Sequence, residues 1–132
     1  MRISSTDSKS WIEIQRNKDD DFPSFQFRAA IDIEHGTFSA CNSSLAFLNL
    51  RKFAEEVDQF ILHRELRPFL EGTYESYLKL RQTDSNEILI TFCIGDTFCG
   101  CKSTDEFRLH GSFPIEQDIL TTLASEFMSL SK

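Results

Sequence analysis

Hydrophobic and polar positions alternate most regularly between residues 25 and 34. Apolar side chains take every second position there: Phe25, Phe27, Ala29, Ile31 and Ile33. A period of two over this stretch predicts a strand with one buried and one solvated face. The pair His35-Gly36 then marks a turn, and residues 37–42 are predicted to return as the second strand of a hairpin.

Further segments have the composition of strands, because they combine β-branched and aromatic residues with alternation. They are residues 11–16, 73–81, 87–94, 97–102 and 106–113. Within 73–81 we expect one face to contain Tyr74, Ser76, Leu78 and Leu80. The last two segments predict a hairpin that turns at residues 103–105.

Two segments show helical spacing instead. In residues 49–64 the apolar positions form one stripe: Leu50, Phe53, Val57, Phe60 and Ile61. Asn49 is the expected N-cap of this helix. In residues 115–130 the corresponding stripe contains Ile119, Leu120, Leu123, Phe127 and Leu130. Pro114 suits the first helical position of that segment.

The predicted order of elements is β-β-β-α-β-β-β-β-α. Because strands and helices do not alternate, a doubly wound parallel sheet is disfavoured. We predict an α+β fold: an antiparallel β-sheet of about six or seven strands, with one face covered by two amphipathic helices. A length of 132 residues is typical of one domain, which we place at residues 11–132. The polar residues 1–10 are expected to be disordered or frayed.

Acidic residues outnumber basic ones by 21 to 14, which gives a formal net charge of -7. Nucleic acids and anionic membranes are bound through clusters of Lys and Arg, so neither is an expected partner. The sequence contains no apolar run of about 18 residues, the length that spans a bilayer. Its polar first residues do not resemble a secretory leader. We therefore expect a cytoplasmic protein whose cysteines are reduced thiols.

The segment Cys99-Gly100-Cys101 is the first candidate for chemistry. Its two thiols fall on one face of a strand, and with Cys93 or His110 nearby they would supply ligands to zinc, which takes four nitrogen or sulfur ligands. A redox pair is a second alternative. The usual spacing of two intervening residues is absent, so a packing role is the favoured interpretation.

The histidines and the known catalytic motifs give no further candidate. His35 falls in a predicted turn, His63 near a helix end and His110 in a strand, and the pattern places none of them beside a cysteine. No phosphate-binding loop, nucleophile elbow or zinc-protease motif occurs. We therefore predict no enzyme activity, no cofactor and no metal site.

Acidic side chains cluster in three places. They are the turn Asp19-Asp20-Asp21, the pair Asp32 and Glu34, and the helix positions Glu55, Glu56 and Asp58. The aspartate turn lacks the spacing of a calcium-binding loop. A shared acid-base site is an alternative for the other two groups, but the pattern places them on solvated faces.

The layout from Phe25 to Leu130 resembles the WapI-type immunity proteins, a family of small bacterial proteins. The resemblance lies in the order of elements: a hairpin, an amphipathic helix, a glycine that opens a second set of strands, a final hairpin and a closing helix. The residues that carry it are Leu50, Phe53, Val57, Phe60, Gly72, Leu78, Leu80, the strand 88–94, Phe107 and Leu109. The sequence departs from the family pattern in lacking a tryptophan near Gly72 and in containing Cys-Gly-Cys.

The resemblance implies a cytoplasmic antitoxin-like protein that binds a cognate toxin domain, with no catalytic residue to carry over. Many toxin domains are nucleases with basic clefts, to which an acidic surface would be steered. The expected contacts are Asp19, Asp20, Asp21, Asp32, Glu34, Glu55, Glu56 and Asp58. A charge that only keeps the chain soluble and a structural or housekeeping domain acting as a homo-oligomer are the alternatives.

Overall fold

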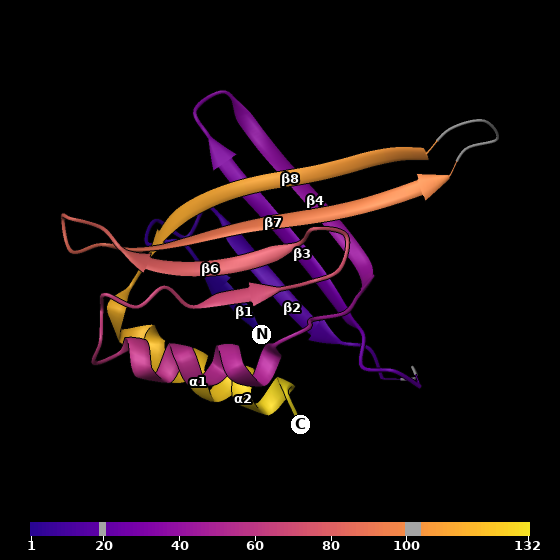
Figure 1. Cartoon of the computed structure of the whole chain (residues 1–132). Coiled ribbons are helices and arrows are strands. Elements are labelled where there is room, and N and C mark those ends of the chain that lie inside the picture. Colours follow the sequence, from indigo (N-terminus) through magenta and orange to yellow (C-terminus); the bar gives the residue numbers. More distant parts are fainter. Residues whose placement is uncertain (19–20, 100–103) are drawn as a thin grey trace.

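Two antiparallel sheets lie across one another, and two helices cover one end of both (Figure 1). The computed structural model describes residues 1–18, 21–99 and 104–132. The first sheet contains β1 (Arg2–Ser4), β2 (Trp11–Arg16), β3 (Phe25–Ile33) and β4 (Gly36–Leu45) in that order. The second contains β5 (Phe69–Glu71), β6 (Tyr77–Gln82), β7 (Ile88–Cys99) and β8 (Thr104–Ile115). The helix α1 (Leu50–Phe60) joins the sheets, and a 3-10 turn (Gln117–Ile119) leads into α2 (Leu120–Leu130).

The α+β class is confirmed, and the single sheet of six or seven strands is wrong. The described residues form eight strands in two sheets of four. β7 runs unbroken from Ile88 to Cys99 in place of the separate strands predicted over 87–94 and 97–102, and it includes Gly95 and Asp96, although both residue types are poor strand formers. β5 is only three residues long, too short for an alternation pattern to reveal.

The first ten residues are ordered, which corrects the prediction of a frayed segment. Ile3 is 1% exposed, and β1 pairs with β2 in antiparallel register. The following turn is closed by a hydrogen bond from the backbone N–H of Ser5 to the carbonyl of Ser10 (2.8 Å). At the protein surface, Glu13 of β2 forms ion pairs with both Arg2 and Arg28. One apolar side chain among polar ones was too weak a signal to reveal this strand.

The two sheets are joined at the end that the helices cover. The backbone N–H of Thr73 donates to the carbonyl of Ala46 (2.9 Å), and on the other side that of Thr6 donates to the carbonyl of Pro114 (3.0 Å). Between the sheets, the rings of Phe27 and Phe92 meet edge-on with centroids 6.5 Å apart. At the opposite end the β3–β4 and β7–β8 hairpins diverge (Figure 1).

The helices pack through the stripes that the spacing predicted. Phe53 of α1 and Phe127 of α2 are fully buried, and their rings meet edge-on at 4.8 Å. α1 ends at Phe60, four residues before its predicted end, and α2 begins at Leu120. The later start has a clear cause, since Ile115 still belongs to β8, opposite Ile88. No helix in the described part of the chain is long and apolar enough to cross a membrane.

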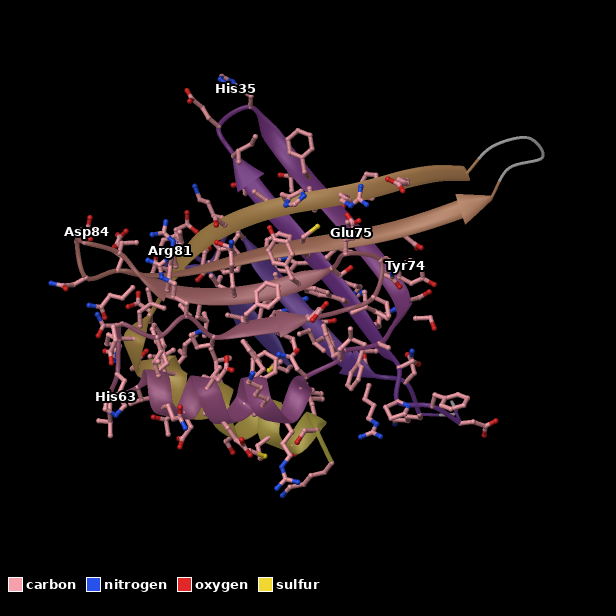
Figure 2. All side chains as sticks on the ribbon, in the orientation of Figure 1. His35, His63, Tyr74, Glu75, Arg81 and Asp84 are labelled. Atoms are coloured by element: carbon pink, nitrogen blue, oxygen red, sulfur yellow. The ribbon has the colours of Figure 1, made fainter. Side chains whose placement is uncertain are left out.

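The segment before β6 is a turn, not the strand predicted from residue 73. Tyr74 and Glu75 both take left-handed backbone conformations, with φ of 57° and 59°, and lie at the turn marked in Figure 2. The turn is closed by a hydrogen bond from the N–H of Gly72 to the carbonyl of Ser76 (2.8 Å). Tyr74 is therefore exposed, while Ser76 is buried like Leu78 and Leu80, with which it was predicted to share a face.

Candidate functional site

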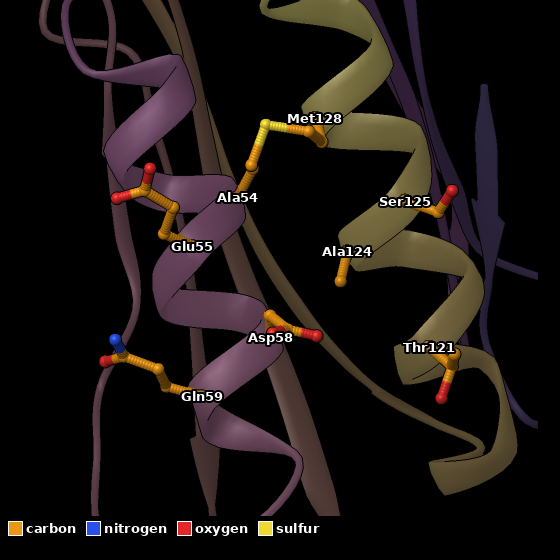
Figure 3. Close-up of a pocket in the computed structure, with 8 residues that line it drawn as sticks. All are labelled: Ala54, Glu55, Asp58, Gln59, Thr121, Ala124, Ser125 and Met128. Atoms are coloured by element: carbon orange, nitrogen blue, oxygen red, sulfur yellow. The ribbon is translucent and has the colours of Figure 1, made fainter.

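A groove of about 450 Å³ runs between α1 and α2 on the outer side of the helix pair (Figure 3). Side chains from both helices line it: Ala54, Glu55, Asp58, Gln59, Thr121, Ala124, Ser125 and Met128. The two helices each have an alanine where they face one another, so the groove between them is not filled by large side chains. Two acidic positions predicted as partner contacts, Glu55 and Asp58, lie on its rim.

The floor of the groove is apolar. Ala54 and Ala124 are 1% and 7% exposed, and the side chain of Met128 reaches from α2 toward Ala54 (Figure 3). Methionine fits irregular apolar surfaces because it is flexible and polarisable. A partner side chain with a long aliphatic stem would find a complementary surface here.

The rim of the groove is acidic. Glu55 forms an exposed ion pair with Arg51 of the preceding turn, with 3.6 Å between the charged atoms. The carboxylate of Asp58 points toward α2 in Figure 3, and within the described residues no side chain is bonded to it. Of the described residues that line the groove, two are acidic and none is basic. The groove thus offers negative charge beside an apolar floor.

Glu56 does not share this groove. Its carboxylate accepts a hydrogen bond from the backbone N–H of Phe69 (3.4 Å) and lies 3.8 Å from the ammonium of Lys52. It therefore connects α1 to β5. Asn49 acts in a similar way, because its side-chain amide bonds the carbonyl of Phe69 (2.7 Å) and the N–H of Glu71 (2.8 Å), and it forms no side-chain cap.

The structure places Asp32 and Glu34 away from the helices. Asp32 and Glu34 are exposed next to the tip of the β3–β4 hairpin, at the end of the molecule opposite the helices (Figure 1). Asp32 accepts a hydrogen bond from the hydroxyl of Thr37 (3.0 Å). Asp21 is exposed in the loop between β2 and β3, and Asp19 and Asp20 lie outside the described residues. Asp32 and Glu34 therefore belong to a different surface from Glu55 and Asp58, and the binding role of all the predicted acidic contacts stays a prediction.

A second polar cluster crosses the outer face of the second sheet. The hydroxyl of Tyr77 lies 3.2 Å from Nδ1 of His110, and Nε2 of His110 lies 3.6 Å from Sγ of Cys93. These residues are register partners on β6, β7 and β8, so the strand alternation places them in one row. Sequence reasoning did not pair His110 with Cys93, because the pairing depends on the register of β7 and β8.

This row is not arranged as a nucleophile. Cys93 is 0% exposed, and burial raises the pKa of its thiol. The thiolate, which is the reactive form, is therefore disfavoured at neutral pH. Burial also raises the pKa of the Tyr77 hydroxyl, with a smaller effect from Cys93. The row cross-links three strands.

The remaining candidates are spread over the molecule. Among the described residues no group of three or more metal-ligating side chains occurs. The zinc and redox alternatives for Cys99 and Cys101 are not tested, since Cys101 and the side chain of Cys99 lie outside the described part. His35 and His63 are exposed and each lies 3.9 Å from a neighbouring glutamate, Glu34 and Glu65.

Sequence reasoning missed the α2 side of the groove. The residues it overlooked are Thr121, Ala124, Ser125 and Met128. An alanine on the apolar stripe of each helix was the available signal, because small residues let two helices approach closely. Nothing local showed that these two helices were neighbours.

Comparisons of the chain with models of known protein families, with curated proteins and with solved structures find no match.

Proposed function

We propose that this chain is a non-enzymatic protein-binding module that neutralises a bacterial toxin domain by binding it, as the resemblance to WapI-type immunity proteins implies. The observation that supports the proposal is the groove between α1 and α2, with its apolar floor and acidic rim. Its partner would be a basic protein surface in the cytoplasm.

The groove suits a lysine or arginine side chain better than an acidic or neutral one. The aliphatic stem of such a side chain would lie on Ala54 and Ala124, and its charged end would meet the carboxylate of Asp58. The net charge of -7 would steer a basic partner toward the chain from a distance. Because such steering acts through long-range charge, association should slow as salt is added.

Occlusion would be the mechanism. A toxin whose cleft binds a phosphate backbone presents lysines and arginines there, and an acidic surface can occupy the same cleft. No catalytic group of this chain is needed, since binding alone excludes the substrate.

The test begins with the native cell. The full chain is captured with its bound proteins, and partners are identified by mass spectrometry. Dissociation constants for the captured partner are then measured for wild-type chain and for Asp58→Arg. We expect this charge reversal to weaken binding at least about tenfold, because it removes an attractive charge and adds a repulsive one.

Asp84→Arg is the matched control. Asp84 is exposed in the turn between β6 and β7 (Figure 2) and does not line the groove, and its reversal changes the net charge by the same amount. A second variant, Asp32→Arg with Glu34→Arg, tests the hairpin tip. If both Asp58→Arg and Asp84→Arg bind like wild type, the groove is not the contact. If the captured partners are not basic proteins, occlusion of a nucleic-acid cleft is refuted.

A further inference from the structure

β8 leaves a long edge of the second sheet unpaired. It is the last strand of that sheet, and among the described strands it pairs with β7 alone. The carbonyl of Pro114 points away from β7, because it accepts from Thr6. Backbone groups alternate in direction along a strand, so the N–H and C=O groups of Glu106, Arg108 and His110 also point away. Within the described chain no backbone hydrogen bond to these groups is formed. Such an edge can pair with another strand.

The β3–β4 hairpin extends past this edge. β3 crosses β7 where Phe27 meets Phe92, and it crosses β8 at Ile31. There Gly111 is required, because a Cβ atom on it would lie 2.8 Å from Cγ1 of Ile31. The rest of the hairpin, beyond Ile31, therefore continues outside the second sheet, as the crossing in Figure 1 also shows.

The surface next to the edge is apolar. Ile33 and Phe38 lie on the inner face of the extending hairpin and are 50% and 53% exposed. On the inner face of β8, Phe107 is 49% exposed. A strand paired with the edge of β8 beside Phe107 would cover that ring, while Ile33 and Phe38 lie on the hairpin beyond its crossing of β8 at Gly111. An exposed apolar ring at an unpaired sheet edge marks an interaction surface.

We propose that a second copy of this chain occupies the edge, with the two β8 strands paired antiparallel about a two-fold axis at Phe107. In this register Glu106 faces Arg108 of the second copy, and Arg108 faces Glu106 of that copy. An axis at Arg108 would set two like charges opposite one another, and an axis at Leu109 would place Arg108 opposite His110. The sequence of charges along β8 therefore favours one register.

Arg108 can form an ion pair with Glu106 of the second copy without losing the contacts it makes in its own chain. Its guanidinium lies 2.5 Å from Glu75 and 3.1 Å from Glu106 of its own chain, and it has five N–H donors. The two inner faces of the paired strands lie on the same side, so the two Phe107 rings meet near the axis. The interface is closed, because each copy uses its one β8 edge, and it does not propagate into a fibre. The groove between α1 and α2 stays free, so this inference does not depend on the proposed function.

The test measures the oligomeric state of the full chain by sedimentation equilibrium over about a hundredfold range of concentration. Wild-type chain should reach twice the mass of the 15.3 kDa monomer. Glu106→Arg and Arg108→Glu should each weaken dimerisation at least about tenfold, since each sets like charges opposite one another. The double variant, Glu106→Arg with Arg108→Glu, should dimerise again. The two single variants, once mixed, should form a heterodimer.

The matched control is Glu87→Arg, an exposed reversal at the start of β7 and away from this edge, which should dimerise like wild type. Far-UV circular dichroism checks folding, because Arg108→Glu also removes the ion pair with Glu75. Glu106→Arg removes only the exposed pair with Arg108 of its own chain, keeps the pair of Arg108 with Glu75, and stays informative if the other variant is unstable. A wild-type chain that is monomeric at every concentration overturns the proposal. So does a dimer that neither single variant weakens, or a double variant that does not recover.

Discussion

Gly95 lies where three segments of the chain meet, and its replacement by alanine should be costly. Its backbone N–H donates to the hydroxyl of Ser76 (2.9 Å), and its carbonyl accepts from the side-chain amide of Asn42 (2.8 Å). Both side chains are buried. A Cβ atom at position 95 would lie 2.1 Å from the carbonyl oxygen of Tyr74. Because that oxygen belongs to the backbone, no side-chain rotation relieves the contact.

The magnitude follows from these contacts. To accept Gly95→Ala, the turn that contains Tyr74 must move by at least about 1 Å to reach van der Waals distance. Overpacking of this kind costs about 1–3 kcal/mol, and each buried hydrogen bond that the movement weakens contributes about 1 kcal/mol. We expect the free energy of unfolding to fall by about 3 kcal/mol in total. With the urea dependence of a chain this size, the unfolding midpoint should fall by about 2 M.

Urea unfolding followed by circular dichroism measures this loss, and Gly36→Ala is the control. The nearest atom to a Cβ atom at position 36 is Cε2 of Phe38, at an ordinary 3.9 Å, and no described glycine has a positive φ. This control should change the free energy of unfolding by no more than about 0.5 kcal/mol. Equal midpoints for the two variants would refute the close approach of the turn to β7.

Three further predictions concern chemistry and stability. Iodoacetamide should label the exposed Cys41 well before Cys93, because burial raises the pKa of the Cys93 thiol. Equal labelling rates in peptide mass spectrometry would contradict this prediction. The hydrogen bond from Arg28, and to a smaller extent the one from Arg2, lowers the pKa of Glu13. The substitution Glu13→Gln should therefore lower the free energy of unfolding by about 1 kcal/mol or less at pH 7. That cost should fade as the pH drops below 4.5, because Glu13 in the unfolded chain binds a proton at a higher pH than Glu13 in the folded chain. Urea titrations at pH 7 and below pH 4.5 measure the change. Phe53→Ala should lower the free energy of unfolding by about 3–5 kcal/mol, measured by the same urea titration. A much smaller loss would refute the packing of Phe53 on Phe127.

Local patterns predicted the parts of the structure whose burial repeats along the chain. The inward positions of β3 from Phe25 to Ala29 are buried as the alternation indicated, and the stripes of α1 and α2 face the core. The alternation also continues to Ile33, which is half exposed. The pattern cannot show where the second sheet stops covering the first, because that depends on the crossing of β3 over β8.

The candidate site was only half visible in the sequence. Glu55 and Asp58 were identified as acidic and solvated, and both are exposed on the rim of the groove. Glu56 has the same charge and lies between them in sequence, but its carboxylate bonds the backbone of Phe69. The direction of each side chain around the helix, and what lies opposite it, separates a carboxylate on the rim of the groove from one that bonds the backbone of a strand.

The sequence by itself determined the α+β class, the inward faces of the main strands and helices, and a strongly acidic surface. Tertiary structure alone decided that there are two sheets, that α1 and α2 form a groove, that Cys93 meets His110, and that β8 has a free edge next to an apolar hairpin. The physical reason is the range of the interactions. Burial along one element follows a period of two or 3.6 residues and can be read locally. Which elements become neighbours depends on pairings between residues far apart in the chain, and those pairings leave no periodic trace.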